Sequence, residues 1–169
     1  NTIIEHDVVI GKNCVIGSGV ILKNSLIGER VVIQDNCKIG QKGFGFIPIK
    51  NNNFKFPHIG RVIISDNVEI ASSCTIDRGS VDDTVIGKNT YLDNQVHIGH
   101  NCIIEDFCIL AGQVGLSGSV FLKKNVVLGG DVSIKDNVTI GKNSIIAGAS
   151  KVFNSFPDGS NLGGSPAQD

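Results

Sequence analysis

Residues 85–146 read VIGKNTYLDNQVHIGHNCIIEDFCILAGQVGLSGSVFLKKNVVLGGDVSIKDNVTIGKNSII, and every sixth residue from Ile86 to Ile146 is isoleucine or leucine. The eleven positions are Ile86, Leu92, Ile98, Ile104, Leu110, Leu116, Leu122, Leu128, Ile134, Ile140 and Ile146. A helix repeats every 3.6 residues and a strand every two, so neither explains a strict interval of six. That interval is typical of the hexapeptide parallel β-helix, in which each hexad forms one short strand and one corner. We therefore expect an all-β chain.

The same register continues upstream, with one five-residue step and one gap. Its members are Ile4, Ile10, Ile16, Leu22, Ile27, Ile33, Ile39, Ile64, Ile70 and Ile76, which brings the count to 21 hexads. Three hexads close one triangular coil, so we expect about seven coils and, at ~4.8 Å per stacked strand, a rod of roughly 34 Å. We assign residues 1–152 to this prism and residues 153–169 to a C-terminal capping tail.

The position two residues before each aliphatic is usually valine or cysteine, so it also points inward. All five cysteines stand there: Cys14, Cys37, Cys74, Cys102 and Cys108. We interpret them as small buried hydrophobic residues, not as metal ligands, disulfides or nucleophiles. Five reduced thiols are typical of a cytoplasmic protein.

The charge balance excludes several classes of partner. Fifteen Lys and Arg face sixteen Asp and Glu, for a net charge of −1. Such a chain has no basic field for nucleic acid or anionic lipid. No apolar run approaches membrane-spanning length, so we expect no membrane span.

The longest interruption of the repeat runs over residues 41–58, QKGFGFIPIKNNNFKFPH. It contains four of the eight phenylalanines, among them Phe44 and Phe46. An aromatic loop leaving a rigid prism is expected to fold on its flank or to wall a ligand groove. We take Phe44 and Phe46 as candidate substrate-binding residues, and a self-packed Ω-loop is the equally weighted alternative.

A second interruption, DRGSVDDTV at residues 77–85, adds four residues between Ile76 and Ile86. Its charged side chains, Asp77, Arg78, Asp82 and Asp83, are consistent with a solvated corner.

Histidine is rare, with His6, His58, His97 and His100 as the only examples. His100 follows Ile98 at a corner, and Asp93 lies at the preceding corner. A lone corner histidine is usually a solvated surface group, whereas an imidazole oriented by a carboxylate is typical of a general base. We take His100 as the candidate base, Asp93 as the group that fixes its tautomer, and His97 as an outward-facing residue.

Several segments together resemble a known enzyme family. They are TIDRGSVDDTVIG (75–87), LDNQVHIGHN (92–101) and AGQVGLSGS (111–119), with GFGF (43–46) upstream and SPAQ (165–168) near the end. In this order they are similar to the UDP-3-O-(3-hydroxyacyl)glucosamine N-acyltransferases of lipid A synthesis. The resemblance covers about residues 40–168 and implies a left-handed helix, a homotrimer, and acyl transfer from an acyl carrier protein to the 2-amine of UDP-3-O-acylglucosamine.

The resemblance also implies roles for individual residues. His100 matches the family's general base, and Asp93 and Asn94 match the residues that support it. Gly118, eighteen residues and one coil further on, matches the backbone N–H at the thioester oxygen. No cofactor or metal is implied, because the thioester is already activated.

Two departures from the family pattern stand out. Asn137 occupies the position of a second histidine associated with phosphate, so we list it as a substrate-binding candidate that carries no charge. The family's N-terminal uridine-binding domain has no counterpart in this chain, so we expect the chain to be the catalytic prism of a longer enzyme.

Three other functions remain open at this point. One is the related O-acyltransferase that acts on UDP-N-acetylglucosamine, against which GFGF and the DNQ triplet argue. Another is a zinc-dependent carbonic anhydrase, which would need a third stacked histidine. The last is a non-catalytic structural or ice-binding prism, which would need flat arrays of threonine.

Overall fold

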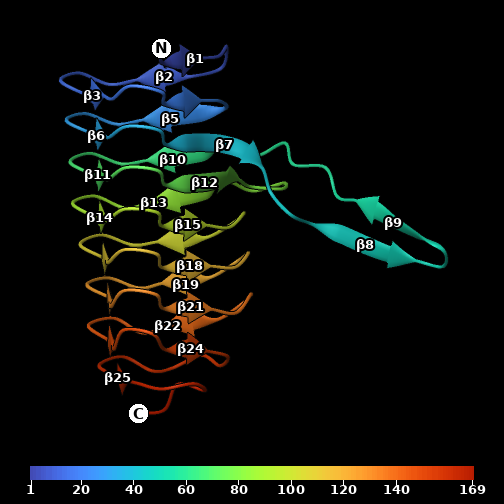
Figure 1. Ribbon diagram of the computed structural model, residues 1–169, viewed down its shortest axis with the longest axis vertical. Coiled ribbons are helices and arrows are strands. Elements are labelled where there is room, and N and C mark those ends of the chain that lie inside the picture. The colour runs from blue at the N-terminus through green and yellow to red at the C-terminus, as the bar shows by residue number, and fades with distance from the viewer.

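The computed structural model describes residues 1–169 and shows a parallel β-solenoid with no helix (Figure 1). The first face contains β1 (Ile3–Ile4), β4 (Ile21–Leu22), β7 (Lys38–Lys42), β12 (Thr75–Arg78), β15 (His97–Ile98), β18 (Gly115–Leu116), β21 (Ser133–Ile134) and β24 (Lys151–Val152). The second face contains β2 (Val9–Ile10), β5 (Ser25–Ile27), β10 (Val62–Ile64), β13 (Thr84–Ile86), β16 (Ile103–Ile104), β19 (Phe121–Leu122) and β22 (Thr139–Ile140). The third face contains β3 (Val15–Ile16), β6 (Val32–Ile33), β11 (Glu69–Ile70), β14 (Tyr91–Leu92), β17 (Ile109–Leu110), β20 (Val127–Leu128), β23 (Ile145–Ile146) and β25 (Asn161–Leu162).

The predicted register is confirmed strand by strand. Ile98 pairs with Leu116 and Leu116 pairs with Ile134, so residues eighteen apart lie in adjacent coils of one face. From Val20 onward, the hexad aliphatics and the valines and cysteines two residues before them make up most of one core of 35 buried residues. Each fully buried Leu or Ile contributes about 1.5–3 kcal/mol, and it does so only when the coils above and below are in place.

The prism is longer than the seven coils expected, because two faces hold eight strands and one holds seven. The extra length comes from Val152 and Leu162, which are buried although the Ile/Leu count ended at Ile146. Residues 153–169 are therefore not only a capping tail, since β25 pairs with β23 and extends the third face.

The five cysteines are unpaired, and four of them are buried as predicted. Cys14 is only half-buried, which corrects the prediction for that residue. It lies in the first coils, where Ile3 and Ile4 on β1 are also half-exposed.

The corners use glycine and asparagine for different reasons. Asn101 and Asn137 adopt φ near +60°, the left-handed region that asparagine tolerates. Gly99, which directly follows an aliphatic, has no positive φ, but a Cβ there would lie 2.8 Å from the backbone of Ser117. Close packing between coils therefore requires this glycine.

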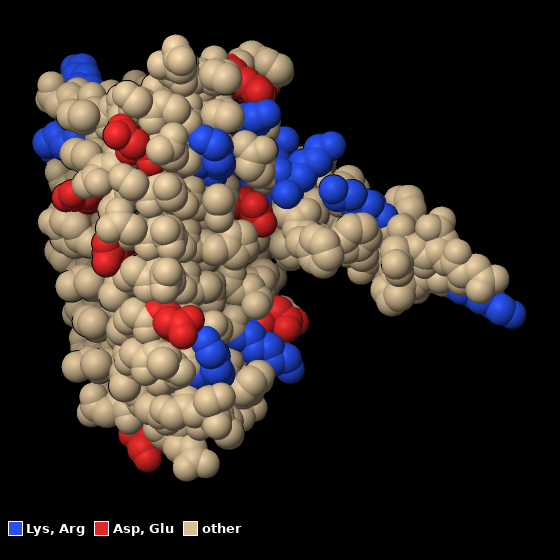
Figure 2. Space-filling model, in the orientation of Figure 1, with Lys and Arg blue, Asp and Glu red and all other residues tan.

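The interruption at residues 41–58 leaves the prism as an antiparallel hairpin of β8 (Phe46–Ile49) and β9 (Asn52–Lys55) (Figure 1). All eight of its strand residues are exposed. Figure 2 shows Lys and Arg gathered along this projection, whereas the prism face carries both signs. Arg78 ties the returning limb to the prism by donating hydrogen bonds to the carbonyl oxygens of Gly60 and Ile59.

Candidate active site

His100 lies at the corner between the first and second faces, after β15, and Gly118 occupies the same corner one coil further on. A Cβ built on Gly118 would lie 2.7 Å from His100 Nε2 and 2.6 Å from Cε1. The imidazole therefore packs directly against the Gly118 backbone. The stacking predicted from the eighteen-residue spacing is confirmed. The Gly118 N–H donates a hydrogen bond to no group of the chain.

Asn101 fixes the tautomer of His100. Its Oδ1 accepts hydrogen bonds from the backbone N–H and the hydroxyl of Ser80, and its Nδ2 donates to the carbonyl oxygen of Asp82. These bonds orient the amide, so the oxygen 2.9 Å from His100 Nδ1 can only accept. Neutral His100 therefore carries its proton on Nδ1, and Nε2 presents a lone pair.

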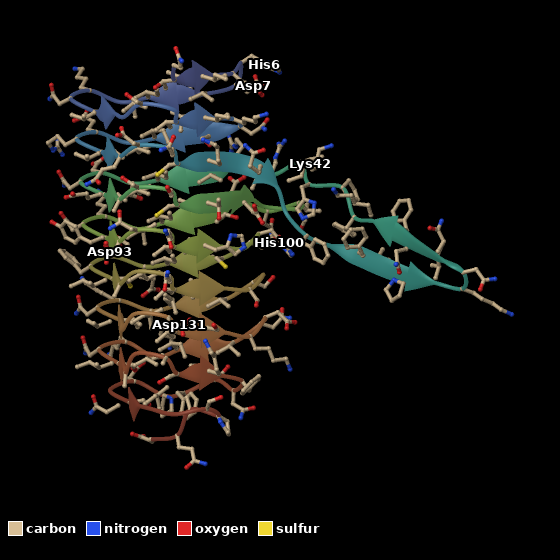
Figure 3. The ribbon with its side chains drawn as sticks, in the orientation of Figure 1. His6, Asp7, Lys42, Asp93, His100 and Asp131 are labelled. Atoms are coloured by element: carbon tan, nitrogen blue, oxygen red, sulfur yellow. The ribbon has the colours of Figure 1, made fainter.

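The prediction that Asp93 orients His100 is wrong within the chain. Asp93 lies at the corner between the third and first faces, and Figure 3 shows it on the opposite side of the prism from His100. Its Oδ1 accepts hydrogen bonds from the backbone and side-chain N–H groups of Asn94, and Asn94 Oδ1 accepts one from Ser72. One hexad spans one side of the triangle, so a residue seven positions earlier belongs to a neighbouring corner.

His58 is a site residue that the sequence reasoning missed. It is 3% exposed, and its ring lies edge-on to that of His100 with centroids 5.1 Å apart. Nδ1 lies 3.0 Å from the carbonyl oxygen of Phe56, which only accepts, so Nε2 carries a lone pair. That nitrogen is buried without a partner. The only signal in the sequence was a histidine at the return of the aromatic loop.

Burial lowers the pKa of His58 below its ordinary value of 6.5. The hydrogen bond to Phe56 acts in the opposite direction, and His100 nearby lowers the pKa further. His58 therefore stays neutral beside the candidate base.

Two cavities meet at His100. The larger, about 680 Å³, is lined by Phe46, Phe56, His58 and polar residues that include Ser80 and Asn101. The smaller, about 350 Å³, is lined by Phe44, Asp77, His97 and Gly118. The aromatic loop thus walls both cavities as well as projecting from the prism, so it is not a self-packed Ω-loop.

Asp77 and His97 belong to this site, although the sequence suggested a solvated corner for Asp77. Asp77 is half-buried on β12, where the pairing with β7 slips by one residue. Burial raises the pKa of Asp77 above its ordinary value of 3.8, and the charges of His97 and His100 act in the opposite direction. His97 is exposed as expected, and a hydrogen bond of 2.8 Å joins its Nδ1 to Thr75 Oγ1.

Asn137 lies on the same corner as His100, two coils further on, where its backbone N–H donates to the carbonyl oxygen of Gly118. Its side-chain amide donates to Asp136, so an acidic group adjoins the position expected to bind phosphate. Within the chain, no three His, Cys, Asp or Glu side chains are grouped so as to hold a metal ion. The chain has no helix long and apolar enough to cross a membrane.

Comparisons with known proteins agree with the hexapeptide-repeat fold. The bacterial transferase hexapeptide (six repeats) family matches residues 83–118, and the hexapeptide repeat of succinyl-transferase matches residues 131–150. Among solved structures, UDP-N-acetylglucosamine acyltransferase from Campylobacter jejuni superposes with a TM-score of 0.77 at 26% identity, covering 98% of this chain and 71% of that one. The Francisella novicida enzyme of the same name gives 0.69 at 30% identity, covering 89% and 58%.

Two curated relatives are more similar in sequence. UDP-3-O-acylglucosamine N-acyltransferase of Methylorubrum populi is 47% identical over 152 residues, which cover 90% of this chain and 43% of that protein. Its counterpart in Methylobacterium nodulans is 45% identical over 145 residues, covering 86% and 41%. The chain thus spans less than half the length of these relatives. On this similarity, together with the hexapeptide repeat, the chain belongs to the UDP-3-O-acylglucosamine N-acyltransferase family.

Proposed function

We propose that this chain carries the acyl-transfer centre of an enzyme that moves a 3-hydroxyacyl group from acyl carrier protein to the 2-amine of UDP-3-O-(3-hydroxyacyl)glucosamine. The observation that carries the proposal is the pair formed by His100 and Gly118. The imidazole of His100, which presents its Nε2 lone pair, packs against the backbone of Gly118, and the Gly118 N–H has no hydrogen-bond partner in the chain. A base beside a free backbone N–H that can act as an oxyanion donor is what acyl transfer requires.

In the proposed reaction, the acceptor nitrogen attacks the thioester carbonyl carbon while His100 Nε2 takes a proton from that nitrogen. The Gly118 N–H stabilises the developing negative charge on the carbonyl oxygen. The C–S bond then breaks, and the imidazolium returns the proton to the leaving thiolate. A general base contributes about 10²–10⁴ in rate and an oxyanion donor about 10²–10³, so these two groups supply a large part of the catalysis. The proposal invokes no metal or cofactor.

The proposal extends to the partners of the site. Phe46 lines the larger cavity and Phe44 the smaller one, which supports the proposal that both contact the substrates. The family resemblance supports a homotrimer, and the five unpaired cysteines are consistent with a cytoplasmic enzyme. Sedimentation analysis of the purified protein tests the trimer.

The second candidate is O-acyl transfer to UDP-N-acetylglucosamine, which the superposed solved structures favour. The full-length protein, supplied with 3-hydroxyacyl carrier protein, separates the two when each acceptor is offered alone. We expect amide formation on UDP-3-O-acylglucosamine and little ester formation on UDP-N-acetylglucosamine. A higher kcat/KM for the second acceptor would replace the proposal with O-acyl transfer.

A further inference from the structure

Asp77 is a half-buried carboxylate for which the reaction above has no use. It lines the smaller cavity together with His97, His100 and Gly118. No group of the chain donates a hydrogen bond to its carboxylate, and the charges that favour its ionised form are those of the two histidines. Arg78, the nearest cation in sequence, is held elsewhere by the carbonyl oxygens of Ile59 and Gly60.

Partial burial of a carboxylate that has no hydrogen-bond partner costs free energy. A ligand that brings a cationic hydrogen-bond donor to the carboxylate lowers this cost. The donor also has to fit the cavity of about 350 Å³ that Asp77 lines together with His100. A primary ammonium group meets both conditions.

We propose that Asp77 binds the amino group of the acceptor sugar in its ammonium form beside His100, and thereby selects an amine over a hydroxyl acceptor. This inference rests on the proposed acyl-transfer function and assigns a specificity-determining residue to it.

The proton balance of the reaction agrees with this role. A bound ammonium acceptor loses two protons in all: the first must leave before the nitrogen has a lone pair with which to attack the carbonyl carbon, and the second leaves as the C–N bond forms and the C–S bond breaks. The first proton goes to solvent, and the second passes to His100 Nε2 and then to the leaving thiolate. A hydroxyl acceptor loses only one proton and carries no charge, so an unpaired carboxylate beside the base favours the amine.

The test measures binding and turnover separately on the full-length protein. UDP-3-O-acylglucosamine is compared by calorimetry with the analogue that carries a 2-hydroxyl in place of the 2-amine, and both are then offered as acceptors. Asp77→Asn keeps the size of the side chain and removes its charge. Asp131→Asn is the matched control, because it removes one exposed carboxylate whose ion pair with Lys151 lies at the protein surface.

We expect the unmodified protein to bind the amine about 10- to 100-fold more tightly than the hydroxyl analogue, as for a hydrogen-bonded charged group. Asp77→Asn should remove most of that preference and raise the KM for the amine, with the KM for the acyl donor unchanged. Asp131→Asn should retain the preference.

Two results would overturn the inference. One is equal binding of the two ligands by the unmodified protein, which needs no variant. The other is an unchanged preference in Asp77→Asn at an unchanged melting temperature. If the unmodified protein prefers the amine ligand but forms no amide, the proposed function fails while the assignment of Asp77 as the amine-binding group stands.

Discussion

Asn101 Oδ1 lies 2.9 Å from His100 Nδ1 and is held there by two hydrogen bonds from Ser80. The neighbour in sequence therefore does the orienting that we expected of Asp93. An amide oxygen at Nδ1 favours the Nδ1–H tautomer without adding a charge, and in that tautomer Nε2 carries the lone pair that a base needs.

Replacing Asn101 with aspartate tests this relationship. A carboxylate at Nδ1 favours the protonated imidazole, so the acid limb of the pH–rate profile should move to higher pH and turnover at pH 6 should fall. Aspartate tolerates the positive φ of this position, and a melting temperature measured alongside shows what the lost hydrogen bond from Asn101 Nδ2 to the Asp82 carbonyl oxygen costs. Asn125→Asp, at a matching corner with φ of 62°, should leave the profile unchanged. An unshifted profile in Asn101→Asp would remove Asn101 from the mechanism.

Replacing Gly118 with alanine should reduce kcat about 100-fold or more, because the new Cβ would lie 2.7 Å from His100 Nε2 and would displace the base. Gly130→Ala is the matched control. Gly130 also stands two residues after a core leucine, and its Cβ would meet only one atom, at 3.4 Å. Steady-state kinetics that show equal losses in the two variants would contradict the packing argument.

Replacing His100 with alanine should lower turnover of the full-length protein by about 10²–10⁴. The melting temperature should change little, because a corner side chain adds little to the stacked core. His97→Ala should cause a smaller loss. Near-normal acyl transfer by His100→Ala would show that another group is the base.

The thiols should differ in reactivity. Burial raises the pKa of Cys102 to about 12 and that of Cys108 to about 11, whereas Cys14 is only half-buried. A thiol-labelling reagent at pH 7.5, followed by mass spectrometry, should modify Cys14 first and the buried thiols only on unfolding. Cys102→Val should cost less than about 1.5 kcal/mol, because valine fills the same inward position at Val120 and Val138. Uniform fast labelling would contradict the buried placement.

His58 should make stability depend on pH. Its folded-state pKa is lowered, so the unfolded chain binds more protons than the folded chain below about pH 6.5. The stability associated with neutral His58 is therefore present above pH 6.5 and is lost as the pH falls through the folded-state value. Melting temperatures from pH 7.5 to pH 5 should fall less in His58→Gln than in the unmodified protein. His6→Gln, at an exposed side chain, should not alter the slope.

The repeat alone was sufficient for the prism, its register and the stacking of Gly118 above His100. These features follow from side chains that must point inward every six residues, and each coil contacts only its neighbours. The sequence also located the aromatic loop and the candidate base. It underestimated the length of the prism, because valine at Val152 and the longer step to Leu162 fell outside a strict count of isoleucine and leucine.

The tertiary structure alone decided which polar side chains surround His100. Asp93 is only seven residues from His100 in sequence but lies at another corner. Asp77, from the preceding coil, and His58, from the end of the aromatic loop, are more distant in sequence but lie beside the base. A hexad interval specifies the face on which a residue lies. It does not specify where the aromatic loop returns to the prism, which depends on the hydrogen bonds of Arg78. Nor does it specify how the one-residue slip between β7 and β12 orients Asp77, or which groups hold Asn101, because these depend on packing between coils.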